Sequence, residues 1–250
     1  MPPIEHIIIL FLVGLLAGFI NVMAGGGSTL TLPALIFLGL DTATANGTNR
    51  VAILIQNIAA VTAFKKEKHS KFKLSLKMAL CTLPGAIAGA IIAAKIDDET
   101  FKIILGVIMI AVAVSMLIPK KKISETVENP DKLKPSVYLA MVGIGFYGGF
   151  IQVGVGFLLM AALHYLIHIN LVHVNMHKVF IILIYTAPAL LVFTITGNVN
   201  YGLGLAMAAG NALGGWQAAK LAVRKGEKIV KVALIAGIFV ISLKLFGVFG

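Results

Sequence analysis

Acidic residues, cysteine and tryptophan are all scarce in this chain of 250 residues. It contains 10 Asp and Glu against 21 Lys and Arg, with one cysteine and one tryptophan. The single cysteine, Cys81, excludes an intrachain disulfide and a metal site built on cysteines. The chain also lacks a GxxxxGK[ST] motif, which excludes ATP hydrolysis at a P-loop. Because no nucleophile, base and orienting group converge in the sequence, we expect neither an enzyme nor a bound cofactor.

Charged residues of both signs together are also few, and apolar residues take their place. Charged residues make up 12% of the chain and hydrophobic residues 59%, with a mean hydropathy of +0.98. A soluble domain has about 25% charged residues. Apolar runs such as Ile103–Ile118, Val179–Thr196 and Lys228–Phe249 approach the roughly 20 residues that a membrane-spanning helix needs. We therefore expect an all-α, multi-pass protein of the cell membrane, either a plasma or an inner membrane.

The net charge of +11 has its source in short loops between the apolar runs. Lysines cluster in "KKEKHSKFK" (Lys65–Lys73) and in "PKKK" (Pro119–Lys122). Basic loops of this kind are typical of cytoplasmic loops beside anionic lipid headgroups. We therefore expect membrane lipids and no nucleic acid as partners. The sequence leaves the oligomeric state open, a homo-oligomer included.

The second half of the sequence repeats the first. "GFINVMAGGG" (Gly18–Gly27) resembles "GFIQVGVG" (Gly149–Gly156), "TNRVAILI" (Thr48–Ile55) resembles "MHKVFIILI" (Met176–Ile184), and "PGAIAGAIIAAKI" (Pro84–Ile96) resembles "AGNALGGWQAAKL" (Ala209–Leu221). The three pairs occur in the same order at similar spacings, as internal repeats do. We therefore divide the chain into a first transmembrane repeat (1–119), a cytoplasmic hinge (120–135) and a second transmembrane repeat (136–250).

Each repeat is predicted to contain one broken or re-entrant apolar segment followed by three transmembrane helices. The broken segments are Ile4–Gly39 and Val137–Ile169, and the helices are Thr48–Phe64, Leu74–Ala94 and Thr100–Ile118 in the first half and Lys178–Thr196, Tyr201–Val223 and Lys228–Phe249 in the second. Each broken segment is too long for one span, and glycines divide it into two arms.

Loop charges predict that the two repeats have inverted topology. The loop Lys65–Lys73 carries five lysines and its counterpart Thr196–Asn200 none, whereas Lys95–Thr100 is acidic and its counterpart Arg224–Lys228 is basic. If basic loops face the cytoplasm, Lys95–Thr100 and Thr196–Asn200 lie outside, together with both chain termini. Each half then crosses the membrane an odd number of times. Such inverted repeats predict a substrate site near the membrane midplane, where the broken segments meet.

The glycine-rich breaks favour an anion as ligand. Gly25, Gly26 and Gly27 are expected to unwind the chain and expose backbone N–H groups, and the helix that follows would direct the positive end of its dipole at the gap. Ser28 and Thr29 would add hydroxyl donors. The related break contains Gly148, Gly149, Gly154 and Gly156, with Gln152 matching Asn21. Tight helix crossing is the structural alternative for such glycines.

A second pair of motifs places a cation next to amides or a histidine. "NGTNR" (Asn46–Arg50) matches "NMHK" (Asn175–Lys178), so that Asn49 pairs with His177 and Arg50 with Lys178. Each cation is predicted to begin an apolar helix, where it would oppose the helix dipole and require an anionic neighbour. The alternative is that Arg50 and Lys178 extend to lipid headgroups.

Acidic residues are few in the predicted membrane segments, which also favours an anionic substrate. Asp41, Asp97, Asp98 and Glu99 all fall in predicted loops, so the buried carboxylates typical of cation pumps are absent from those segments. A competing hypothesis uses the histidines. His164, His168, His173 and His177 follow at spacings of four, five and four, and an i, i+4 pair can bind a transition metal. The alternative function is therefore a divalent metal-ion transporter.

These motifs resemble the TauE/SafE family of sulfite and organosulfonate exporters. The residues that carry the resemblance are "GFINVMAGGGSTLTLPAL" (Gly18–Leu35), "NGTNRVAILIQN" (Asn46–Asn57), "PGAIAGAIIA" (Pro84–Ala93) and the diverged second copy. The resemblance implies a secondary transporter that exports small sulfur-containing anions, such as sulfite or sulfoacetate. It implies these substrate-binding candidates: Asn21, Gly25, Gly26, Gly27, Ser28, Asn49, Arg50, Gln152, Gly156, His177 and Lys178. The breaks add Thr29, and the mechanism expected is alternating access at a midplane site.

Overall fold

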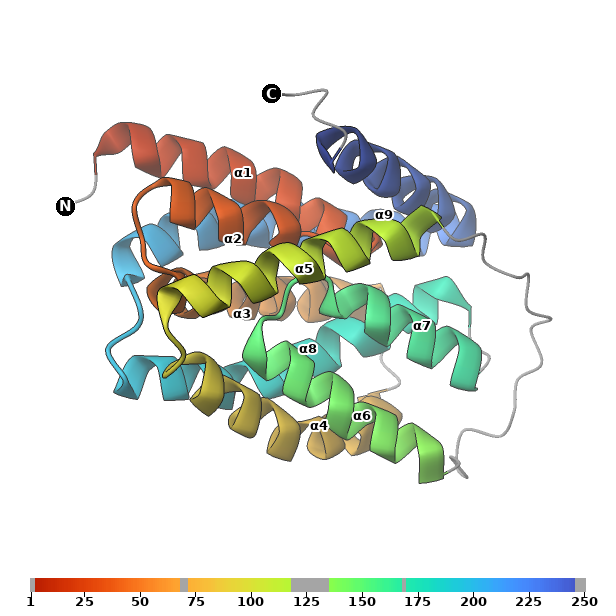
Figure 1. Ribbon diagram of the computed structural model, residues 1–250. Helices are drawn as coiled ribbons and strands as arrows, with labels where there is room; N and C mark the ends of the chain where they lie inside the picture. The colour runs from red at the N-terminus through yellow and green to blue at the C-terminus, as the bar shows by residue number, and fades with distance from the viewer. Residues whose placement is uncertain (1–2, 68–71, 118–134, 168–169, 246–250) are drawn as a thin grey trace.

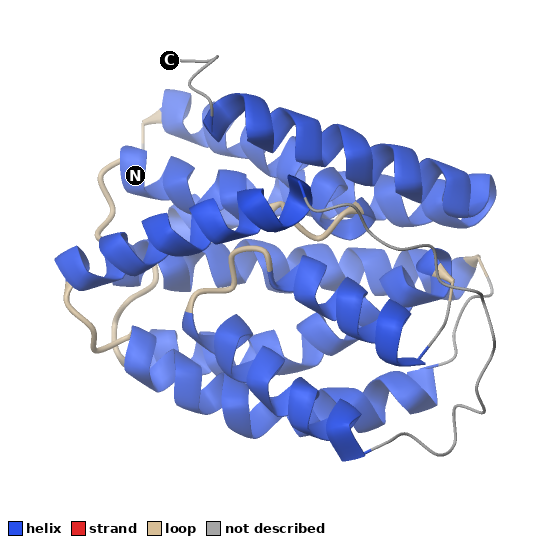
Figure 2. Cartoon of the chain, turned by 45° about the vertical axis from the view of Figure 1, so that its right-hand side comes forward, coloured by secondary structure: helices blue, strands red, loops and turns tan. Residues whose placement is uncertain are grey.

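The computed structural model describes residues 3–67, 72–117, 135–167 and 170–245, and across these residues the chain is helical without strands (Figures 1 and 2). The helices are α1 (Ile4–Met23), α2 (Ser28–Phe37), α3 (Thr42–Lys66), α4 (Phe72–Ala93), α5 (Asp98–Leu117), α6 (Pro135–Phe150), α7 (Val155–Ile167), α8 (Leu171–Ile195) and α9 (Tyr201–Leu245). Apart from Pro135, which begins α6, the predicted hinge 120–135 lies outside the described residues. The prediction of an all-α polytopic membrane protein is confirmed.

Both broken segments are divided as the sequence predicts. Residues 24–27 separate α1 from α2, and residues 151–154 separate α6 from α7. Left-handed backbone occurs in each break, with φ of 93° at Gly25, 61° at Gln152 and 73° at Gly154. Glycine adopts this region without strain, whereas Gln152 is held there against its preference. Within α9, Gly226 is not helical (φ 68°, ψ −162°), so α9 contains the two predicted helices joined at a kink.

Two helices begin earlier than the sequence analysis predicts. The helix α3 begins at Thr42 instead of Thr48, because the Asp41 side chain accepts a hydrogen bond from Thr44 N at 2.9 Å. In the same way, α8 begins at Leu171 instead of Lys178, with Asn170 accepting from His173 N at 3.0 Å. The expectation that Arg50 and Lys178 begin their helices is therefore wrong, since each lies about two turns inside.

Small residues hold the helices close together in two equivalent pairs. In the first pair, Gly14 and Gly18 of α1 lie against the backbone of Met207 and Asn211 in α9. In the second pair, Gly85 and Gly89 of α4 lie against the backbone of α6. A Cβ at any of these four glycines would come within 2.4 Å of a backbone oxygen of the facing helix. Close backbone approach at small residues is the usual basis of helix packing in membranes.

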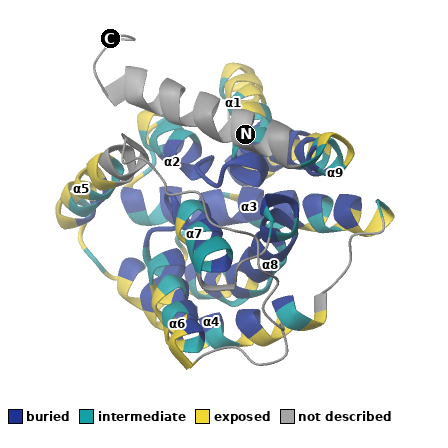
Figure 3. Ribbon diagram, turned by 90° about the vertical axis from the view of Figure 1, so that its right-hand side faces the viewer, coloured by how far each residue is buried: buried dark blue, intermediate teal, exposed yellow. Residues whose placement is uncertain are grey.

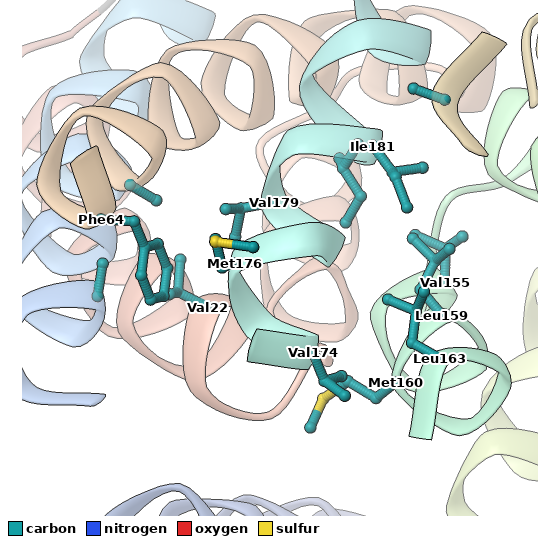
Figure 4. Close-up of a cluster of buried hydrophobic side chains, with 14 of the residues drawn as sticks. Val22, Phe64, Val155, Leu159, Met160, Leu163, Val174, Met176, Val179 and Ile181 are labelled. Atoms are coloured by element: carbon teal, nitrogen blue, oxygen red, sulfur yellow. The ribbon is translucent and has the colours of Figure 1, made fainter. Parts of the chain in front are cut away.

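The helices α3 and α8 lie in contact at the centre of the molecule, where they are largely buried, whereas their C-terminal ends are exposed (Figure 3). Apolar side chains fill the space around α8, where Met176 and Val179 lie beside Val22 and Phe64 (Figure 4). Exposed apolar residues lie on the outer helices, as in Leu12, Ile103 and Leu139. This distribution fits a surface that faces lipid. Among the described helices, three are long and apolar enough to cross a membrane: Ile4–Met23, Lys73–Ala93 and Leu171–Ile195.

The described loop residues lie at two ends of the molecule, in the groups that the loop charges predict. At one end, Asn198 Nδ2 donates to Ala94 O at 3.3 Å, which joins the α8–α9 loop to the α4–α5 loop. Asp98 at this end accepts from Thr42 N at 2.7 Å, and hydrogen bonds from Lys102 and from Thr42 lower its pKa to about 2. At the other end, Arg224 pairs with Glu67 at 3.1 Å, between the basic loops.

The two broken segments are helical hairpins that enter from opposite ends. The helix α1 runs parallel to the first part of α9, and α2 returns to the end where Asp41 precedes α3 (Figure 1). The helix α6 runs parallel to α4, since Gly145 lies against Thr82 and Gly149 against Ala86. Because α4 begins at the opposite end from α9, the second hairpin enters from the other side. The two halves are therefore inverted with respect to each other.

Cysteine labelling tests which end faces the cytoplasm. In a Cys81→Ser background, we expect Glu99→Cys to react with a membrane-impermeant maleimide on intact expressing cells, because the α4–α5 loop is predicted to lie outside. Lys225→Cys, in the basic loop of α9, should react only after permeabilisation. Both positions are exposed. Reaction of both cysteines from the same side would contradict the arrangement, and the reverse pattern would show that the predicted sidedness is wrong.

Candidate functional site

The two glycine-rich breaks cross in direct backbone contact at the centre of the molecule. A Cβ built on Gly25 would lie 2.4 Å from the carbonyl carbon of Gly156, and one built on Gly156 would lie 2.4 Å from Gly25 Cα. The structure thus brings together two of the predicted site residues. Because their backbones touch, no room for a ligand remains between these two glycines.

The first break is tightly packed and uses some of its own donors. A Cβ on Gly27 would lie 2.2 Å from Ala17 O of α1. Thr29 Oγ1 donates to Gly26 O at 2.7 Å, so its hydrogen is not directed at a ligand as the sequence analysis expected. Ser28 and Thr29 are both buried. The first N–H groups of α2 are also used within the break, since Thr29 N donates to Gly26 O at 3.1 Å and Leu30 N to Gly27 O at 3.0 Å.

Lys178 of α8 holds the end of α1. Its ammonium donates to Asn21 O at 3.0 Å, to Val22 O at 2.8 Å and to Asn175 Oδ1 at 2.8 Å. Asn175 Nδ2 in turn donates to Met23 O at 3.3 Å. The last three carbonyls of α1 therefore have donors from the opposite half of the chain. A cation at this place also interacts favourably with the negative end of the helix dipole.

Arg50 of α3 holds the end of α6 in the same way. Its guanidinium donates to Gly148 O at 3.1 Å, to Gly149 O, and to Asn46 Oδ1 at 3.3 Å. Asn46 Nδ2 donates to Phe150 O at 2.7 Å, so the last three carbonyls of α6 have donors as well. The guanidinium also lies 4.8 Å from the ring centroid of Phe193, a cation–π distance.

The two cation sites are equivalent in the two repeats. The capped carbonyls are 127 residues apart in the sequence, and Asn46 and Asn175 are 129 apart. By this spacing Gln152 matches Gly25, and both carry a positive φ. The conformational match of Gln152 is therefore with Gly25 and not with Asn21. Each half supplies the cap for the broken helix of the other half, so neither hairpin is complete alone.

Both cations are enclosed by protein. Arg50 and Lys178 are each 0% exposed, so the alternative that they extend to lipid headgroups is wrong. Among the described residues, the buried polar and charged side chains include no Asp or Glu. Neutral carbonyls and amides are therefore the partners that surround the two charges here. Buried charges normally require compensation, and a dissolved anion could provide it.

The remaining predicted residues lie near these sites in different roles. Asn21 Nδ2 donates to Gln56 Oε1 at 3.3 Å, and Gln152 Nε2 donates to Thr186 Oγ1 at 3.4 Å. His177 Nδ1 lies 2.6 Å from Ser75 Oγ, which ties α8 to α4. Asn49 is fully buried, and within the described chain neither atom of its amide has a hydrogen-bond partner.

Sequence analysis missed several polar residues that surround the breaks. Asn46 and Asn175 stand in the quoted motifs but are not among the predicted site residues, and neither are Gln56, Tyr185 and Thr186. Gln56 and Tyr185 are also 129 residues apart, so a search for polar residues at the repeat spacing could have found this pair. Tyr185 is fully buried, and its ring would lie 2.8 Å from a Cβ on Gly148.

The described histidines of the series lie in two helices, His164 in α7 and both His173 and His177 in α8, where His177 contacts Ser75. His164 lies in α7 with its ring 5.4 Å from that of Tyr165, His173 lies at the start of α8, and His168 falls outside the described residues. The described part of the chain contains no group of three or more His, Cys, Asp or Glu arranged to hold a metal ion. No contact in that part favours the metal-transport alternative.

Substitution of Gly156 tests the contact between the breaks. Gly156→Ala places a methyl group against the backbone of Gly25 and should lower the free energy of unfolding by about 1–3 kcal/mol, the usual cost of overpacking. Thermal unfolding of the purified protein in detergent measures the change. Gly143→Ala in α6 is the matched control, because nothing lies within 4 Å of its Cβ position. Equal stability of the two variants would contradict the contact.

Removal of Lys178 tests the capping of α1. Lys178→Met leaves the last carbonyls of α1 and the Asn175 amide oxygen without this donor, and should lower the free energy of unfolding by about 1–3 kcal/mol. The matched control is Lys220→Met, whose ammonium is partly exposed and lies 4.9 Å from the Trp216 ring centroid. We expect the control to lose less than about 1 kcal/mol in the same thermal measurement. A larger loss in the control would argue against the cap.

Comparison with known proteins identifies the family to which the chain belongs. The family model described as "Sulfite exporter TauE/SafE" matches residues 10–245. "Probable membrane transporter protein ORF9" of a Sinorhizobium species is 30% identical over 238 residues, covering 94% of this chain and 90% of that protein. "Probable membrane transporter protein YfcA" of Escherichia coli K12 is 30% identical over 240 residues, covering 95% and 88%. No solved structure matches the chain significantly. The chain therefore belongs to the TauE/SafE family of membrane transporters.

Proposed function

We propose that this transporter exports small sulfur-containing anions, such as sulfite, sulfoacetate or related sulfonates, across the cell membrane. One observation carries the proposal. Two fully buried cations lie at the crossing of two broken helices, and the described residues place no buried carboxylate beside them. A site with unbalanced positive charge attracts anions and repels cations. The family description, which names sulfite export, supplies the class of anion.

The inverted hairpins suggest how such an anion would cross. Hairpin α1–α2 enters from one end and hairpin α6–α7 from the other, and they meet at Gly25 and Gly156. Movement of one repeat against the other about this contact would open the site first to one side and then to the other, which is alternating access. Because an exported anion moves down an inside-negative potential, the membrane potential can drive export without a coupled ion.

Transport by reconstituted protein tests the proposal. Proteoliposomes that contain the full chain and labelled sulfite or sulfoacetate should release the label faster than protein-free liposomes. Arg50→Gln should slow the initial rate by about tenfold or more, because it removes a charged donor from the site. The double variant His164→Ala, His168→Ala should transport at the wild-type rate.

The same assay distinguishes the proposal from the metal-transport alternative. Transport of a divalent metal that the histidine double variant abolishes would contradict anion export. Absence of transport for every sulfur anion, together with normal transport of another solute, would also show that the proposed function is wrong. Folded protein is confirmed for each variant by its elution profile in detergent before reconstitution, so that loss of transport is not confused with loss of the fold.

A further inference from the structure

The two buried cations differ in how much of their hydrogen-bonding capacity the protein uses. An ammonium has three N–H donors, and Lys178 has oxygen acceptors for all three, at 3.0, 2.8 and 2.8 Å. The sulfur of Met160 lies 3.6 Å from the same nitrogen as a further contact. Lys178 therefore has no donor left for a ligand while α1 keeps this position.

Arg50, in contrast, has an N–H donor without a hydrogen-bond partner in the described chain. A guanidinium has five N–H donors, and its terminal nitrogens bind Gly148 O, Gly149 O and Asn46 Oδ1. Its Nε is buried, and within the described chain it has no hydrogen-bond partner. Buried donors are nearly always paired, so an unpaired N–H on a buried cation indicates a place where a ligand or water binds.

A second unpaired group lies beside Arg50. Tyr185 of α8 lies near Arg50 and Gln152, and its ring packs at Gly148, whose carbonyl Arg50 binds. Its hydroxyl is buried and has no hydrogen-bond partner among the described residues. Gln152 Oε1 is also buried there without a partner in the described chain. Two helices, α3 and α8, and the second break thus place unpaired polar atoms near one another.

We infer that the transported anion binds on the Arg50 side of the crossing, where it accepts hydrogen bonds from Arg50 Nε and from the Tyr185 hydroxyl. Lys178 does not contact the anion, and it acts as a positioning residue that holds the end of α1. The ligand class is a small anion with at least two acceptor oxygens, one for each donor. This inference rests on the proposed function, and it assigns unequal roles to two cations that the repeat makes equivalent.

A purely structural role for Tyr185 gives a different expectation from a binding role. If the hydroxyl only fills space, its removal relieves an unpaired buried group, so stability stays equal or rises and anion affinity stays the same. If the hydroxyl binds the anion, stability again stays equal or rises but affinity falls. The two measurements together therefore separate the roles, and the substitution does not depend on a bond that the fold needs.

Anion titration of purified full-length protein in detergent tests the inference, with sulfite, sulfoacetate and nitrate as probes and calorimetry as the readout. Tyr185→Phe should bind the preferred anion about tenfold more weakly than wild type, which is the loss expected for one charge-assisted hydrogen bond. Its melting temperature should be equal or higher. Tyr138→Phe, at a partly exposed tyrosine of α6, should bind as wild type does.

Charge-conserving exchanges supply a second, independent comparison. Arg50→Lys keeps the charge but removes Nε, and should weaken binding about tenfold. The matched control is Lys220→Arg, a charge-conserving exchange at the partly exposed lysine of α9, which should change affinity less than about threefold. If Arg50→Lys does not fold, the comparison of Tyr185→Phe with Tyr138→Phe still decides the matter.

The outcomes separate this inference from the proposed function. If sulfite binds to wild type and to Tyr185→Phe and Arg50→Lys with equal affinity, the inference is overturned and the proposed function is unaffected. If only nitrate binds, and Tyr185→Phe weakens it, the proposed substrate class is overturned and the Arg50-side site stands. If none of the three anions binds to folded wild-type protein, both are overturned.

Discussion

A helix that ends inside an apolar interior leaves its last carbonyls without donors, and this constraint shapes the whole molecule. Each unsatisfied group costs several kcal/mol at membrane depth. Here α1 and α6 both end in the interior, and each receives its donors from the other half, through Lys178 with Asn175 and through Arg50 with Asn46. The caps explain why the two repeats interlock, because neither hairpin can be stable until the opposite central helix is in place.

Because the two repeats interlock at the centre of the molecule, side-chain differences between the repeats there change the polar groups around the crossing. Glycine at position 25 and glutamine at position 152 occupy equivalent left-handed positions, yet only glutamine brings an amide into the break. Arginine and lysine cap equivalent helices, yet they differ in donor number and geometry. The two repeats can thus have equivalent backbones and different polar side chains. The two sides of the crossing can therefore differ in how they bind a ligand.

The sequence predicted the structural features that follow from local composition and from the internal repeat. Glycines near 25 and 154 marked the breaks, and loop charge grouped the loops at the two ends, as the Arg224–Glu67 and Asn198–Ala94 contacts confirm. The roles of Arg50 and Lys178 could not be read from their neighbours, because their partners lie about 100 and 157 residues away in the chain. Placing both cations at helix starts was wrong because the caps at Asp41 and Asn170 extend α3 and α8 backwards by six and seven residues.

The choice of neutral partners for the two cations matters for an anion transporter. A buried carboxylate beside Arg50 would compensate its charge fully and leave little attraction for a mobile ligand. Carbonyl oxygens and helix C-termini stabilise a cation through partial charges, so they hold the guanidinium in place while its net charge remains. The scarcity of acidic residues in the membrane segments and the termination of two helices in the interior are therefore linked. Together they keep positive charge buried, positioned and available at the crossing of the breaks.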